Sequence, residues 1–146
     1  MKMNRSQKIA WFTLIVASIG SIISIIVVVL LAAKFGFPKA FAGFACMAVT
    51  GLAGLAGVIF KKDKGKVAFD ERDKDIHIKA SWAGFGASYG FVGLICMSAW
   101  IAIGPDGTVS VNLLPNIFIG AMIIMIIAQS ITTLIGYGRG GKNVSE

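Results

Sequence analysis

Four long apolar stretches dominate the sequence and restrict what it can fold into. They cover residues 9–33, 40–60, 80–103 and 113–137, and none of them contains Asp, Glu, Lys, Arg or His. A helix rises about 1.5 Å per residue, so about 20 residues cross the roughly 30 Å of a bilayer's hydrocarbon core. The sequence therefore predicts an all-α polytopic membrane protein. We expect residues 1–146 to form a single transmembrane domain, built as an antiparallel bundle of four membrane-spanning helices.

Three basic residues, Lys2, Arg5 and Lys8, precede the first stretch, an arrangement that secretory signal peptides share. The apolar run that follows is about twice as long as the usual core of a signal peptide, and no A-x-A-like cleavage site comes after it. We therefore expect residues 9–33 to remain in the protein as its first membrane-spanning helix.

Lysine and arginine are distributed unevenly among the segments outside the apolar stretches. Twelve of the 14 lie in the N-terminal segment, the connection 61–79 and the C-terminal tail. The first connection carries the other two, Lys34 and Lys39. Because cytoplasmic segments of membrane proteins are enriched in basic residues, this pattern predicts a multi-pass protein of the cell membrane with both termini in the cytoplasm. The net charge of +7 then reflects contact with anionic lipid headgroups, and we expect no nucleic-acid partner.

Small residues are frequent in the second and third stretches. Gly51, Gly54 and Gly57 follow one another at intervals of three, and Gly86 and Gly90 form a G-x-x-x-G motif. Membrane helices associate through close backbone approach, which small residues permit. The sequence therefore predicts that these two stretches form the tightest seam of the bundle, or else the interface of a homo-oligomer.

The connection 61–79 begins with four lysines directly after a predicted membrane helix: Lys61, Lys62, Lys64 and Lys66. Juxtamembrane lysines on the cytoplasmic side are attracted to anionic lipids. We expect them to contact lipid headgroups, with a specific ligand site as the alternative.

The rest of this connection, FDERDKDIHIK, has the signals of a helix that starts in water. Asp70 suits the N-cap position, and the pairs Asp70–Lys74 and Asp75–Lys79 place an acid four residues before a base, which is the favourable order. We therefore expect the third helix to extend back to about residue 70. The charged residues at its start are a candidate docking surface for a protein partner: Asp70, Glu71, Arg72, Asp73 and Lys74.

The same segment carries a motif. Asp70-Glu71-Arg72, followed by Ile76, Lys79 and Ala80, resembles the D-E-R-x-x-x-I-x-x-K-A signature of a family of small prokaryotic four-helix membrane proteins. In that family the signature lies on a cytoplasmic loop before a transmembrane helix. The resemblance implies no catalytic role, because the family has no assigned activity. It does imply that the three charged residues at its start form a contact surface.

Residues suited to catalysis or metal binding are scarce. His77 is the only histidine, so a His-based zinc site or catalytic dyad lacks a second histidine. Asp73-x-Asp75-x-His77 is similar to the start of a calcium loop, but the glycine and the closing glutamate of such loops are missing. Cys46 and Cys96 are expected at similar depth as small apolar residues, with copper, redox or disulfide chemistry as alternatives. We expect no metal, no cofactor and no enzymatic activity, and the sequence leaves open whether these cysteines pair.

The densest polar patch within the apolar stretches lies in the fourth, at Gln129, Ser130 and Thr133. Hydrogen bonding between helices is one interpretation, and the lining of a permeation pathway is the other. Proton-driven exporters of this size depend on an acidic residue in the first helix, and residues 9–33 contain none.

Two functions follow from these observations. The first is a non-enzymatic accessory or regulatory membrane component that presents its charged cytoplasmic segment to a cytoplasmic or membrane protein partner. The alternative is a small transporter or channel, which would have to be a homo-oligomer because four helices hardly enclose a pathway alone.

Overall fold

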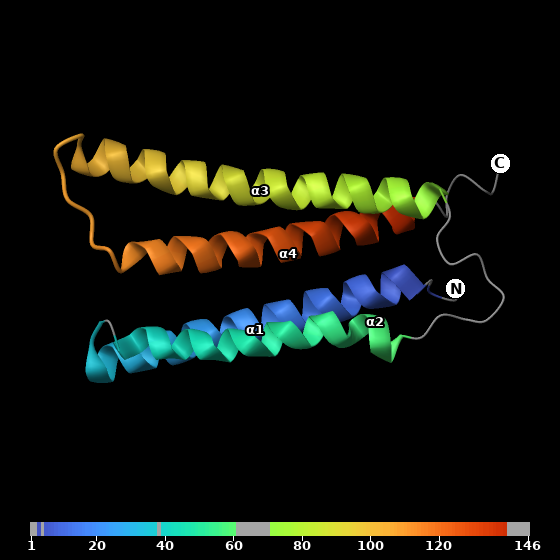
Figure 1. Ribbon diagram of the computed structural model, residues 1–146, viewed down its shortest axis with the longest axis horizontal. Coiled ribbons are helices and arrows are strands. Elements are labelled where there is room, and N and C mark those ends of the chain that lie inside the picture. Colours follow the sequence, from blue (N-terminus) through green and yellow to red (C-terminus); the bar gives the residue numbers. More distant parts are fainter. Residues whose placement is uncertain (1–2, 4, 38, 61–70, 140–146) are drawn as a thin grey trace.

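The computed structural model describes Met3 and residues 5–37, 39–60 and 71–139, and every regular element in these ranges is a helix (Figure 1). In chain order the elements are α1 (Arg5–Phe35), the 3-10 helix η1 (Lys39–Leu55), α2 (Ala56–Ile59), α3 (Glu71–Ile103) and α4 (Leu113–Arg139). Consecutive long helices run in opposite directions, so α1 and α3 begin at the end of the molecule where α2 and α4 finish (Figure 1). The all-α prediction is confirmed for the described residues.

Three of the helices, α1, α3 and α4, are long and apolar enough to cross a membrane. They contain 31, 33 and 27 residues. At about 1.5 Å per residue, each is longer than the hydrocarbon core is thick. The third helix includes the charged segment Glu71–Lys79 as well as the apolar run after it.

The second apolar stretch differs from the single α-helix expected over 40–60. A 3-10 helix of 17 residues covers Lys39–Leu55, and one α-helical turn, α2, follows it. Runs of 3-10 helix this long are uncommon. Its first turns carry buried or half-buried small residues at every third position, at Ala40, Gly43 and Cys46. With three residues per turn, a 3-10 helix arranges such residues in a straight row, which suits close packing along α1.

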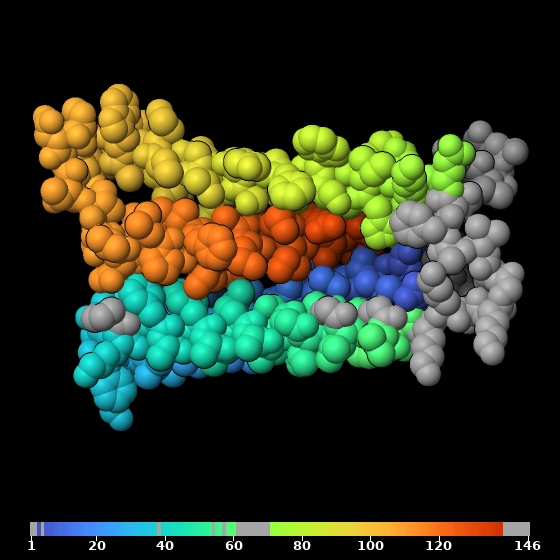
Figure 2. Space-filling view, viewed as in Figure 1, coloured from blue at the N-terminus to red at the C-terminus, as the bar shows by residue number. Residues whose placement is uncertain are grey.

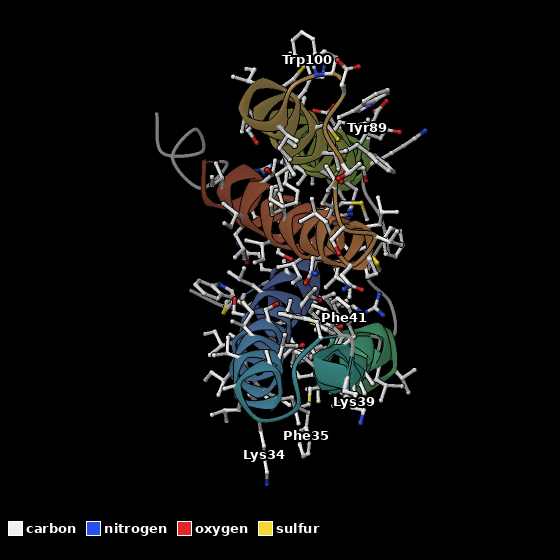
Figure 3. All side chains as sticks on the ribbon, turned by 90° about the vertical axis from the view of Figure 1, so that its left-hand side faces the viewer. Lys34, Phe35, Lys39, Phe41, Tyr89 and Trp100 are labelled. Carbon is white, nitrogen blue, oxygen red and sulfur yellow. The ribbon has the colours of Figure 1, made fainter. Side chains whose placement is uncertain are left out.

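The helices form an open stack. Viewed from one end, α3 lies on α4, α4 lies on α1, and α1 and η1 lie side by side at the base (Figure 3). Within the described residues, α3 contacts neither η1 nor α2, so the expected seam between the second and third apolar stretches is wrong. Small residues allow a helix to be approached closely, but they do not specify which neighbour approaches it.

Small side chains fill the contacts between the helices, and many large apolar side chains are exposed. Figure 2 shows the elongated outline of the stack. Among the described residues, the buried apolar side chains other than Ile76 are alanines: Ala10, Ala17, Ala40, Ala56, Ala80 and Ala121. Outside, Tyr89 is 76% exposed and Trp82 is 74% exposed. Soluble proteins rarely expose large contiguous apolar surfaces, whereas membrane helices associate through small residues.

Candidate functional site

A cluster of polar contacts connects the helices at the end where α1 and α3 begin. We call it the end junction and define it as Arg5, Ser6, Phe60, Asp73 and Tyr137. The Arg5 Nε donates a hydrogen bond to the Phe60 carbonyl at 2.5 Å, which joins the start of α1 to the chain just after α2. The Phe60 ring also meets that of Phe12 edge to face, with centroids 5.9 Å apart. The first two apolar segments are therefore fixed together at this end.

Tyr137 is the centre of the end junction. Its phenol donates a hydrogen bond to the Asp73 Oδ1 at 2.6 Å, although the two residues are 64 positions apart in the sequence. The Ser6 side chain lies beside the same phenol. Because Ser6 is on α1, Asp73 on α3 and Tyr137 on α4, this one side chain connects three helices.

Close packing beside Tyr137 sets the register of this contact. Ile76 is 7% exposed and Ala80 is fully buried, so they form the inward face of the start of α3. A Cβ atom on Gly136 would lie 2.9 Å from the Ile76 Cγ2, so the absence of a side chain at Gly136 lets α3 approach α4. Asp73 precedes Ile76 by about one turn, and this brings its carboxylate to Tyr137.

The candidate docking residues separate into two groups. Asp73 is half-buried in the end junction, whereas Glu71, Arg72 and Lys74 are exposed. Asp70 lies outside the described residues, and so does its expected pairing with Lys74. The structure therefore assigns Asp73 to an internal contact and leaves the other three on the surface.

One predicted helix pair is confirmed. The Lys79 ammonium lies 2.7 Å from the Asp75 carboxylate, and both side chains are exposed. Exposed pairs four apart on a helix contribute only about 0.3–0.5 kcal/mol. This ion pair supports the helical start of α3 without fixing it to a neighbour.

A shallow hollow of about 380 Å³ lies next to the exposed charged residues. Its described lining comes entirely from α3: Lys74, His77, Ile78, Ser81, Trp82 and Phe85. The surface of α3 thus passes from charged side chains to aromatic ones within about three turns.

The four candidate headgroup lysines, Lys61, Lys62, Lys64 and Lys66, lie outside the described residues. Cys46 and Cys96 are free thiols on η1 and α3, which do not touch within the described part of the chain. Over residues 5–37, 39–60 and 71–139, no group of three or more His, Cys, Asp and Glu side chains is placed to hold a metal ion.

The polar patch on α4 is engaged in helix contacts. The Gln129 Nε2 donates to the Ser81 Oγ on α3 at 3.5 Å, a long hydrogen bond. The Thr133 hydroxyl donates to the Gln129 carbonyl at 2.8 Å within the helix. Ser130 and Thr133 are both buried. These contacts favour the packing interpretation of the patch.

Neither Ser6 nor Tyr137 was singled out by the sequence analysis. A signal was present, because Tyr137 ends the fourth apolar stretch on the side where the charged segment precedes the third. Tyrosine is enriched at such boundaries, where its ring lies among apolar groups and its hydroxyl finds a polar partner. The sequence offered no reason to choose Asp73 as that partner over its acidic neighbours.

Comparisons with known proteins give no match: no family model matches the chain, and neither a curated protein nor a solved structure does.

Proposed function

We propose that this chain is a non-enzymatic integral membrane protein that crosses the bilayer four times. It acts as an accessory or regulatory component and presents the charged start of α3 to a protein partner on the cytoplasmic side. The observation that carries this proposal is the fixed start of α3. Asp73 and Ile76 anchor it to α4, while Glu71, Arg72 and Lys74 remain exposed.

Four crossings are supported by the lengths and surfaces of the helices. Three helices are long and apolar enough to span, and their large apolar side chains face outward. A 3-10 helix rises about 2.0 Å per residue, so the 17 residues of η1 extend over roughly 34 Å, which exceeds the roughly 30 Å hydrocarbon core. The apolar η1 is therefore proposed as the fourth crossing.

The distribution of charge supports the orientation. Arg5, Arg72 and Lys74 are on the helix starts at the end junction. At the opposite end the described basic residues are Lys34 and Lys39 (Figure 3). The positive-inside rule then favours the end junction as the cytoplasmic side.

The D-E-R-x-x-x-I-x-x-K-A signature is consistent with such a role. Its apolar positions, Ile76 and Ala80, are the buried ones, and its charged positions Glu71, Arg72 and Lys79 are exposed. One short motif thus contains residues that fix the start of α3 to α4 and, next to them, the exposed Glu71 and Arg72. We propose that the chain is related to the small prokaryotic membrane proteins that carry this signature.

A charge-reversal experiment tests the docking surface. Proteins that co-purify with the wild type in mild detergent are identified, and the main one is then purified and titrated against the protein in lipid nanodiscs. Reversing Glu71→Lys and Arg72→Glu should weaken that binding about ten-fold or more, because misplaced interface charges repel.

The matched control reverses the exposed pair one turn further along, Asp75→Lys with Lys79→Glu, which keeps an ion pair at that site. This control should bind like the wild type. Equal affinity of the Glu71/Arg72 variant and the wild type would refute the docking role.

A further inference from the structure

We propose that Tyr137 is a positioning residue for the charged surface on α3. Its phenol sets the orientation of the first turns of α3 and makes that orientation depend on the start of α1. The docking consequence rests on the function proposed above, whereas the structural part does not.

The start of α3 is held by one neighbouring helix. Within the described residues α3 packs only against α4, and no residue of α3 after Gly84 is buried. Helix ends fray because their first N–H groups lack partners within the helix. The Tyr137–Asp73 hydrogen bond therefore restrains the first turn of α3, which precedes the buried Ile76 and Ala80.

The orientation of Asp73 determines the directions of the side chains beside it on α3. Successive residues on an α-helix are about 100° apart around its axis. When the Asp73 carboxylate is directed at Tyr137, Arg72 and Lys74 lie about 100° to either side of it, and both are exposed. The bond is short at 2.6 Å, as expected where a hydroxyl donates to an ionised carboxylate. Fixing Asp73 thus fixes the directions in which the two basic side chains leave the helix.

The end junction also connects α1 to the start of α3. The Ser6 side chain lies beside the phenol that binds Asp73, and the neighbouring Arg5 donates a hydrogen bond to the carbonyl of Phe60. A shift of α1 relative to α4 therefore alters the partner that orients Asp73. The α1–η1 pair is in this way connected to the exposed surface of α3 without touching it.

Hydrogen exchange in nanodiscs tests the positioning role directly. In Tyr137→Phe the amides of residues 75–79, which are the first with helical partners in α3, should exchange about ten-fold faster than in the wild type. Amides in the middle of α3 should keep the wild-type rate. Tyr89→Phe is the matched control, since Tyr89 is the other tyrosine of the chain and is 76% exposed. Unchanged exchange at 75–79 in Tyr137→Phe would overturn the proposal.

Ser6→Ala tests the coupling. Ser6 is on α1, yet its loss should also accelerate exchange at residues 75–79, by a smaller factor than Tyr137→Phe does. A change limited to α1 would overturn the coupling.

Binding of the purified partner supplies a readout that loss of stability alone would not change. With both proteins folded, Tyr137→Phe should weaken binding several-fold and Tyr89→Phe should not. Equal binding by both variants would overturn the docking consequence. A wild type that binds no partner would refute the proposed function instead, and the exchange rates would still decide the role of Tyr137.

Discussion

A Cβ atom on Gly43 would lie 2.8 Å from the backbone nitrogen of Val28 and 3.0 Å from its Cα, so η1 and α1 are in direct backbone contact. The Ser24 hydroxyl, on a side chain that is 1% exposed, donates to the Gly43 carbonyl at 3.3 Å in the same place. Close approach and a small polar residue together characterise helix association in a lipid environment. This contact holds α1 and η1 together.

Gly43→Ala should therefore destabilise the protein. The added methyl group meets backbone atoms that cannot rotate away, and overpacking of this kind costs about 1–3 kcal/mol. Gly51→Ala is the matched control on the same element, because a Cβ there meets nothing within 4 Å. Thermal unfolding in detergent should show a lower midpoint for Gly43→Ala only. Equal midpoints would contradict the α1–η1 contact.

A second glycine pair tests the packing of α3 on α4. A Cβ on Gly84 would lie 3.0 Å from the Met125 carbonyl oxygen, whereas one on Gly86 meets nothing within 4 Å. Gly84→Leu should lower the free energy of unfolding by at least about 1–3 kcal/mol, and Gly86→Leu should not. Chemical unfolding in mixed micelles measures both variants. A Gly86→Leu variant that is destabilised as much as Gly84→Leu would show that α3 packs through another face.

The helical fold class and the positions of the long helices can be predicted from the sequence alone, because long runs of apolar residues without charges indicate where such helices lie. The inward positions of Ile76 and Ala80 also follow, since residues four apart share one face of a helix. The Asp75–Lys79 ion pair can be predicted for the same reason, because its two residues are four positions apart. Such features depend on neighbours within about one turn, which the sequence displays directly.

Contacts between distant segments do not follow in this way. The glycines of 40–60 and 80–103 suggested that these stretches meet, but Gly43 packs on α1 and Gly84 packs on α4. The 3-10 form of η1 is not visible in its composition, which is as apolar as that of the α-helical stretches. The Tyr137–Asp73 bond joins residues 64 positions apart, and three other acids lie within three positions of Asp73. Only the arrangement of the helices selects between them.

The polar patch on α4 provides a test of the transporter alternative. Gln129 makes a long hydrogen bond to Ser81, so Gln129→Leu should cost no more than about 1 kcal/mol of stability. If the patch is only a packing contact, ion and solute flux into reconstituted vesicles should be at the protein-free level for both wild type and variant. A wild-type flux that Gln129→Leu abolishes would establish a pathway and contradict the accessory role.

The proposed four-span arrangement is tested most directly by determining the side of the membrane on which each connection lies. Single cysteines at Lys8, Phe37, Lys74 and Asp106, introduced with Cys46 and Cys96 replaced by alanine, are labelled in intact cells with a membrane-impermeant maleimide. With the end junction in the cytoplasm, the cysteines at 37 and 106 should react at once, whereas those at 8 and 74 should react only after the cells are permeabilised. Labelling at 8 or 74 in intact cells, or protection at 37, would contradict the proposed four-span arrangement with its end junction in the cytoplasm.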